Sequence, residues 1–244
     1  MNKVLAIIPA REGSKRVPQK NFRPFADTTL VDIAIQHAIG SECITSIVLS
    51  SDSDQVLELA KKYENVLPLK RPLDISDDQS PAIDYVRHAL QICESSEMPY
   101  DMVVILQPSS PLRSAEDIDA CIQLLSRYPE VDSCVSVVKV DHMIHPIKLK
   151  KLNDKRLEPY FEEETGRFAS QDLPDVYVRN CAVYAAWRKD LETKPDVIGK
   201  VSLAHVMPDY TSVDINSILD FEFAEYIYKK IDNENSNRRD RPSW

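Results

Sequence analysis

Glycine is scarce in this chain, which has 4 among 244 residues. The loop that follows the first apolar stretch, residues 4–8, holds a single one, Gly13. A P-loop needs two glycines ahead of its Lys and Ser or Thr, and the dinucleotide-binding fingerprint needs three. The sequence therefore argues against P-loop hydrolases and nicotinamide-dependent dehydrogenases.

Cysteines are few, and long apolar runs are absent from the sequence. The 5 cysteines are odd in number, widely spaced and never arranged as C-x-x-C, so we expect neither a disulfide framework nor a zinc site. No apolar run approaches the roughly 20 residues that span a bilayer. Residues 4–8 are too short for a signal-peptide core, and no small-residue cleavage pattern follows them. We expect a cytoplasmic protein with no membrane partner.

Positive charge is in the minority, with 30 Lys and Arg against 39 Asp and Glu and a net charge of -9. A general nucleic-acid binder needs a basic surface, so we expect no nucleic-acid partner. A protein of this charge that binds a phosphate compound must concentrate its positive charge locally.

Strand-like and helix-like segments alternate through the first half of the chain. Residues 4–8, 47–49, 66–69 and 102–106 are apolar and read as buried strands, and helical periodicity separates them. This order predicts an α/β fold of the Rossmann-like type, with a mainly parallel sheet, in one domain over residues 1–232. Ligands of such sheets bind beyond the carboxyl ends of the strands.

The alternation weakens later in the chain. Residues 141–180 are polar and irregular and predict an inserted hairpin or arm. Residues 181–187 read as a returning strand, and apolar spacing from 218 to 228 predicts a last helix. The polar residues 233–244 are expected to be a disordered tail.

The strongest functional signal is the loop after the first strand. It contains four basic residues, and its Arg11 offers a fork for phosphate oxygens while Lys15 offers a mobile point charge. Gly13 permits a backbone that points N–H groups inward. A solvated basic turn is the alternative, but the loop lies at the carboxyl end of a buried strand in an acidic protein, which favours anion binding.

Residues 9–21 resemble the signature loop of the acylneuraminate cytidylyltransferases, the CMP-sialic acid synthetase family. Further segments resemble the family's motifs in the same order, and together they cover nearly the whole chain. These are residues 71–81, 106–113, 145–148, 171–174, 179–184 and 212–216.

The resemblance implies a nucleotide site. Its residues would be Arg11, Gly13, Ser14, Lys15, Asn21, Arg71, Ser80, Gln107 and Ser109. An amide such as that of Gln107 can both donate to and accept from a pyrimidine base. The alternatives are a helix cap for Ser80, a surface arginine for Arg71, and a proline-bounded turn around Ser109.

A sugar site is implied as well. Its residues would be Gln107, Lys148, Arg167, Gln171, Asn180 and Tyr184. Asn180, Ala182 and Tyr184 alternate, so they should share one face of a strand. Ser170 stands where relatives commonly carry an arginine, so Arg167 or Arg179 is expected to meet the sugar carboxylate.

Asp214 is the expected ligand for Mg²⁺ or Mn²⁺, at the end of a predicted strand. Asn216 stands where family members often have a second carboxylate, and its amide oxygen can still coordinate. Magnesium takes oxygen ligands and keeps several waters. The expected catalytic residues are therefore Arg11, Lys15 and Asp214.

The resemblance implies a homodimer whose arms complete the active sites. In the implied reaction, a sialic-acid-like nonulosonic acid attacks CTP to give a CMP-sugar and pyrophosphate. The same chemistry on an eight-carbon acid, as in CMP-Kdo synthetases, is one alternative. A non-catalytic nucleotide-binding regulator on the same fold is the other.

Overall fold

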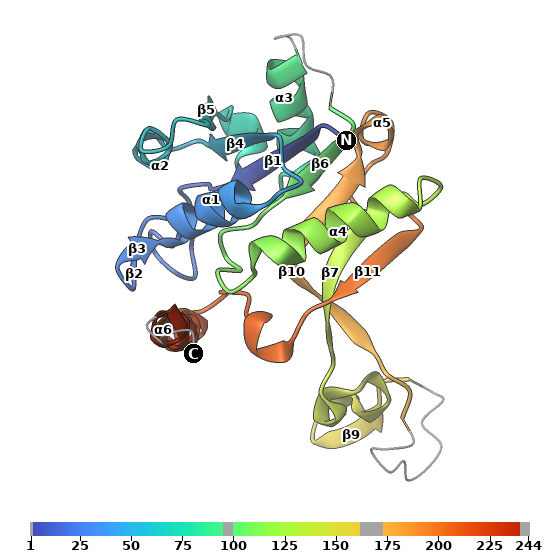
Figure 1. The fold of residues 1–244 in the computed structure, drawn as a ribbon. Helices are drawn as coiled ribbons and strands as arrows, with labels where there is room; N and C mark the ends of the chain where they lie inside the picture. The colour runs from blue at the N-terminus through green and yellow to red at the C-terminus, as the bar shows by residue number, and fades with distance from the viewer. Residues whose placement is uncertain (1, 95–99, 162–172, 240–244) are drawn as a thin grey trace, which may run out of the picture.

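A computed structural model describes residues 2–94, 100–161 and 173–239. Its centre is a seven-stranded sheet with the order β11-β7-β10-β6-β1-β4-β5 (Figure 1). Strand β10 runs antiparallel to both of its neighbours, and every other pair in this sheet is parallel. The predicted mainly parallel sheet is confirmed, and β10 is the returning strand.

The strands of the main sheet are mostly buried, except β5 and β11 at its two edges, which are largely exposed. The strands are β1 Val4–Pro9, β4 Ser46–Ser51, β5 Val66–Lys70, β6 Met102–Ile105, β7 Ser133–Lys139, β10 Tyr177–Trp187 and β11 Ser202–Val206. Pro68 lies in β5 at the edge of the sheet, where a missing N–H removes no ladder bond from an inner strand.

Helices cover both faces of the sheet. They are α1 Leu30–Gly40, α2 Asp54–Ala60, α3 Ala82–Glu94, α4 Ala115–Arg127 and α5 Arg188–Leu191, while α6 Ile218–Arg239 packs away from the sheet. One core cluster joins α1, α2 and α4 to one face, and a second joins α3 and Leu191 of α5 to the other. For α2, α3 and α4, the apolar residues whose spacing predicts a helix are the ones that pack on the sheet.

Two helix starts follow local sequence signals, whereas α2 and α5 have no side-chain cap. Ser114 and Asp117 form a complete capping box at α4, and the Thr29 side chain caps α1. Ser80 does not cap α3. Its hydroxyl donates to Asp77 Oδ1 at 2.7 Å, in a turn that ends before the helix begins at Ala82.

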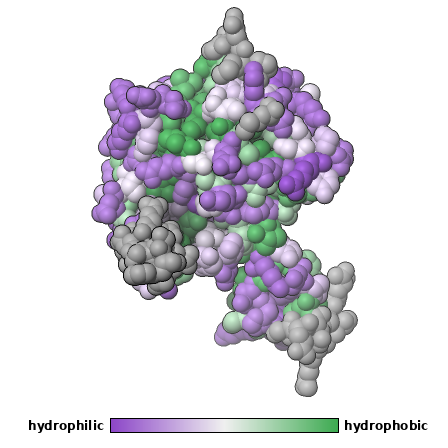
Figure 2. Space-filling view, in the orientation of Figure 1, coloured by the Kyte–Doolittle hydropathy of each residue, from purple (hydrophilic) through white to green (hydrophobic). Residues whose placement is uncertain are grey.

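The predicted arm is a hairpin of β8 Lys150–Asn153 and β9 Arg156–Pro159, preceded by the short 3-10 helices η2 His142–Ile144 and η3 Pro146–Lys148. Its stem is β7 paired with the start of β10, where Tyr177 lies opposite Lys139. The last residues of the predicted arm therefore belong to the sheet. The arm projects from the body as a separate lobe (Figures 1 and 2).

Helix α6 packs against α1 and the small hairpin of β2 Pro24–Phe25 and β3 Thr28–Thr29, through a third core cluster that includes Phe25 and Phe221. It continues to Arg239, so the expected disordered tail from residue 233 is wrong over residues 233–239. No Gly or Pro occurs in residues 218–239, so nothing in that stretch breaks a helix. No helix in the described parts of the chain is long and apolar enough to cross a bilayer.

Candidate active site

A cavity of about 320 Å³ opens beyond the carboxyl ends of β1, β5 and β6, where parallel sheets bind ligands. Strand β1 ends at Pro9, Arg71 follows directly after β5, and Gln107 lies two residues beyond β6. Seven of the nine residues predicted to bind the nucleotide line it. They are Arg11, Ser14, Asn21, Arg71, Ser80, Gln107 and Ser109.

Lys15 lines an adjoining cavity of about 290 Å³, which also contains Arg16 and Asn216. The two cavities share several residues, namely Arg11, Ser14, Lys20 and Asp78, so they form one continuous site. Gly13 lines neither cavity. A Cβ atom built on Gly13 would meet no atom within 4 Å, and its φ is not left-handed, so neither space nor backbone conformation requires glycine there.

The basic loop is held to the body of the protein by its own polar residues. The Asn21 side chain is buried and donates to the Arg11 carbonyl oxygen at 2.8 Å. The Glu12 amide donates to Asp52 Oδ1 at 2.9 Å. Both contacts fix the backbone of the loop and leave the ends of Arg11 and Lys15 over the cavity. There, both cations form ion pairs with Asp78.

Arg71 forms a rigid wall of the cavity. It is buried, and it donates to Ser50 Oγ at 3.1 Å and to the Ser50 carbonyl oxygen at 2.9 Å. Its guanidinium lies 4.6 Å from the ring centroid of Tyr85, within cation–π range. Burial lowers the pKa of Arg71 and raises that of Tyr85. The alternative of a surface arginine is therefore excluded.

The loop after β6 carries Gln107 and Ser109 and depends on Arg113, which is only 1% exposed. Arg113 Nη1 donates to the carbonyl oxygens of Gln107, at 2.6 Å, and Ser110, at 3.1 Å. Burial lowers the pKa of Arg113 to about 9. Sequence reasoning assigned no role to this residue, although a charge directly after the proline-bounded segment 108–112 was a usable signal.

The segment around Asp214 is irregular, so the expectation of a strand end is wrong. Two long-range bonds hold it instead: the Ile215 amide donates to the Ser109 carbonyl oxygen at 2.8 Å, and Lys20 Nζ donates to the Ile215 carbonyl oxygen at 3.0 Å. Asn216 Nδ2 donates to Asp214 Oδ2 at 2.7 Å. Asp214 and Asn216 therefore lie together beside the basic loop.

Lys20 was not singled out from the sequence, yet it borders both cavities. Burial lowers its pKa, which the nearby Asp214 carboxylate partly opposes. Lys20 could have been selected from the sequence because it is the fourth basic residue of the loop.

The sugar residues are only partly brought together. Gln107 lies in the cavity, whereas Lys148 is on η3 of the arm and lines neither part of the site. Arg167 and Gln171 lie outside the described residues.

The alternation of residues predicted that Asn180 and Tyr184 share one face of a strand, and this prediction is wrong. The pairing of β10 with β7 shifts register between Arg179 and Tyr184, and Cys181 has a φ of 62°. Arg179 lies opposite Val137 and Tyr184 opposite Val135, so β10 has three extra residues here. Because this number is odd, the alternation of faces is broken: Ala182 joins the core cluster under α4, and Tyr184 packs on the cluster under α3. Burial, with the neighbouring Cys181 thiol, raises the pKa of Tyr184.

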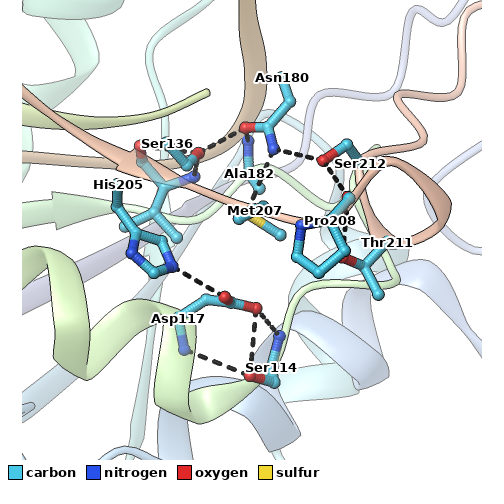
Figure 3. Close-up of polar contacts among 11 residues, drawn as sticks. Ser114, Asp117, Ser136, Asn180, Ala182, His205, Met207, Pro208, Thr211 and Ser212 are labelled. Atoms are coloured by element: carbon cyan, nitrogen blue, oxygen red, sulfur yellow. Dashed lines mark hydrogen bonds and ion pairs between the residues drawn. The ribbon is translucent and has the colours of Figure 1, made fainter. Parts of the chain in front are cut away.

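Asn180 lies inside a polar network (Figure 3). It is 4% exposed, and its Oδ1 accepts from Ser136 Oγ at 2.6 Å. Its Nδ2 donates to Ser212 Oγ at 2.9 Å and lies 3.2 Å from Met207 Sδ. Ser212 in turn donates to the Pro208 carbonyl oxygen at 2.7 Å. Asn180 thus links β10 to the segment that leads to Asp214, instead of projecting toward a sugar.

Residues 5–197 match the model of a protein family described as cytidylyltransferase. The chain belongs to this family. It is 31% identical, over 93% of its length and 97% of the relative's, to the pseudaminic acid cytidylyltransferase of Campylobacter jejuni subsp. jejuni serotype O:2. It is 28% identical to the CMP-N,N'-diacetyllegionaminic acid synthase of Legionella pneumophila, over 91% of this chain and 95% of that one.

Other relatives fit the same family. The N-acylneuraminate cytidylyltransferase of Escherichia coli O18:K1:H7 is 29% identical over 93% of this chain, which spans 52% of that longer protein. Among solved structures, a CMP:2-keto-3-deoxy-manno-octonic acid synthetase complexed with CTP aligns with a TM-score of 0.69 at 13% identity, covering 93% of this chain and 99% of that one. That likeness shows the shared nucleotidyltransferase fold.

Proposed function

We propose that this chain joins CTP and a nonulosonic acid to give a CMP-sugar and pyrophosphate. One observation carries the proposal: Arg11, Lys15 and Gln107 converge at the ligand edge of the sheet, in a chain 31% identical to a pseudaminic acid cytidylyltransferase. In this reaction the anomeric C2 hydroxyl of the sugar acid attacks the α-phosphate, and pyrophosphate leaves. Positioning and charge stabilisation dominate such phosphoryl chemistry.

The two sides of the cavity suit the two parts of the nucleotide. Arg11 and Lys15 provide a forked and a mobile cation for the phosphates. On the opposite side, the buried Arg113 fixes the loop that presents the Gln107 amide, which can read a pyrimidine edge. A charged loop beside a rigid amide is the arrangement that a nucleoside triphosphate needs.

We propose Mg²⁺ or Mn²⁺ as the cofactor, with Asp214 as a direct ligand and Asn216 as an assisting one. No cluster of three or more His, Cys, Asp or Glu able to hold a metal occurs among the described residues. Asn216 Oδ1 accepts from Arg16 Nη1 at 3.2 Å, and Asn216 Nδ2 donates to Asp214 Oδ2. The Asp214 carboxylate fits an ion that takes its other ligands from phosphate and water, and the Asn216 oxygen would have to leave Arg16 to join it. The chemistry supplied by a bound ion is neutralisation of phosphate charge.

We further propose that the protein acts as a homodimer through its arm. Leu152 and Leu157 lie opposite each other in the arm hairpin, and they are 72% and 71% exposed. Exposed apolar groups gathered on one lobe are typical of a surface that a partner covers. Lys148 lies on the same arm, away from its own cavity, so a second copy would bring it to the sugar side of this site.

Light scattering tests the dimer. We expect a dimer for the natural chain and a monomer for Leu152→Lys combined with Leu157→Lys. Leu67→Lys is the matched control because Leu67 is an exposed leucine on β5, at the edge of the main sheet and outside the arm. A fully active natural monomer would refute the shared site.

Pyrophosphate release with CTP and a panel of sugar acids, with product mass as the second readout, tests the reaction. We expect a CMP-nonulosonate, and a loss of about a hundredfold in turnover for Lys15→Ala, as for other groups that stabilise developing charge. Lys61→Ala is the control because that lysine pairs with Glu58 on α2. A product made only from an eight-carbon acid would favour the CMP-Kdo type. CTP binding without any product would indicate a regulator.

Cell fractionation tests the expected cytoplasmic location.

A further inference from the structure

Asp78 stands where a phosphate group would contact the basic loop. One of its carboxylate oxygens pairs with Arg11 Nη1, and the other pairs with Lys15 Nζ. Asp78 borders both parts of the active-site cavity. The two cations expected to bind phosphate oxygens are therefore already engaged by an anion of the chain itself.

The turn that carries Asp78 explains why this carboxylate, and not its neighbour, reaches the loop. Asp77 Oδ1 accepts from the backbone N–H groups of Gln79, at 2.8 Å, and Ser80, at 2.6 Å. These bonds use the Asp77 carboxylate inside its own turn. Asp78 is left to span the cavity toward residues more than 60 positions earlier in the chain.

The positive charge of the loop favours a nearby anion such as Asp78. Residues 11–20 contain four cations, Arg11, Lys15, Arg16 and Lys20, against the single anion Glu12. Without a ligand, these like charges repel one another. Hydrogen bonds from Lys15 and Arg11 lower the pKa of Asp78, so this carboxylate is charged at neutral pH.

We propose that Asp78 is a built-in competitor for the phosphates that bind the basic loop. A carboxylate with one oxygen on each of two cations imitates two non-bridging oxygens of a phosphate. Both anions cannot occupy the same cations, so CTP must displace Asp78 when it binds. By returning to Arg11 and Lys15, Asp78 assists the release of pyrophosphate. This inference rests on the proposed cytidylyltransferase reaction.

Calorimetry with CTP and with inorganic pyrophosphate, both in EDTA, tests the proposal without turnover. Asp78→Asn keeps the size of the side chain and removes its charge. An exposed ion pair contributes at most about fivefold to an equilibrium constant, so two pairs predict a Kd lower by roughly threefold to twentyfold for both ligands. Asp77→Asn is the matched control, since it makes the same charge change one residue away and retains an oxygen that can accept the turn's bonds. We expect its Kd to change less than twofold.

Product inhibition provides a second readout. In the complete reaction, pyrophosphate should inhibit Asp78→Asn at a concentration several-fold lower than it inhibits the natural chain. If Asp78→Asn binds CTP and pyrophosphate no more tightly than Asp77→Asn does, the proposal is wrong. Weaker binding by Asp78→Asn would instead make Asp78 a ligand contact and would also overturn it. These results are distinct from failure of the proposed function, in which the natural chain releases no pyrophosphate with any sugar acid.

Discussion

Replacing Asn180 with alanine separates a structural role from a sugar-binding role. The substitution removes hydrogen bonds to Ser136 and Ser212, at 2.6 and 2.9 Å, from a side chain that is 4% exposed. Each such bond contributes about 0.5–1.5 kcal/mol, and a buried partner left unsatisfied costs more. Ser136 Oγ retains the Val183 amide as a donor at 2.8 Å, which limits this second cost. We expect the free energy of unfolding to fall by about 2–3 kcal/mol.

Thermal unfolding followed by circular dichroism measures this loss. For a domain of this size, 1 kcal/mol corresponds to roughly 2–4 °C in Tm, so Asn180→Ala should lower the Tm by about 4–12 °C. Ser212→Ala removes the bond from Asn180 and the bond to the Pro208 carbonyl oxygen, and it should cost about 1–2 kcal/mol. Because Asn180 and Ser212 share the first of these bonds, the double variant should lose less than the sum of the two single losses.

Steady-state kinetics distinguish a positioning role of Asn180 from a sugar-binding role. A link to the segment before Asp214 should lower kcat together with kcat/KM, whereas lost contact with the sugar should raise the KM for the sugar alone. An Asn180→Ala protein with the natural Tm and a raised KM for the sugar would refute the positioning role and restore the role expected from the sequence.

Three further predictions concern other parts of the site. Arg113→Met should lower the free energy of unfolding by about 2 kcal/mol, because the carbonyl oxygens of Ser110 and Ala182 lose Arg113 Nη1 as a donor. It should also raise the KM for CTP, and urea unfolding and initial rates measure these changes. Asp214→Ala should be nearly inactive at any Mg²⁺ concentration, and Asn216→Asp should bind metal more tightly, which Mn²⁺ binding and a Mg²⁺ titration of the rate both measure. Burial alone would raise the pKa of Asp117, but hydrogen bonds from His205 and Ser114 outweigh it and lower this pKa below the ordinary 3.8. The charged Asp117 carboxylate therefore stabilises the folded protein above pH 3.8, and this stabilisation is lost as the pH falls through the pKa of Asp117 in the folded state. The stability difference between Asp117→Asn and the natural chain in urea should accordingly shrink below about pH 4.

The positions of β1, β4, β5, β6 and β10 and of the nucleotide cavity could be predicted because they depend on local pattern, whereas β7 and β11 were not predicted. Continuous apolar runs identified the first four of these strands, and the rule that ligands bind beyond the carboxyl ends of parallel strands placed Arg11, Arg71 and Gln107 at one edge. All three line the same cavity. The exposed hairpin of the arm also followed from composition, since a polar, irregular stretch cannot supply a buried strand.

The sheet register and the long-range contacts could not be predicted in the same way. Strict alternation placed Asn180 and Tyr184 on one face, but the bulge at Cys181 separates them, and no glycine marks this left-handed residue. Asp78 and Arg113 act through partners fixed only by the tertiary fold: Arg11 and Lys15 for Asp78, and carbonyl oxygens of two different segments for Arg113. A residue whose role is set by distant contacts carries little signal in its neighbours along the chain.

The two sides of the cavity differ in rigidity, and this difference bears on how CTP would bind. On the base side, Arg71 and Arg113 are 4% and 1% exposed and are held by hydrogen bonds to carbonyl oxygens. On the phosphate side, the Lys15 side chain is 81% exposed and is held by its ion pair with Asp78. Preorganised groups bind without a cost of ordering, whereas an exposed lysine must lose rotamer freedom and exchange its partner. Recognition of the base therefore relies on a preformed wall, and the phosphates bind by replacing Asp78 on an adjustable loop.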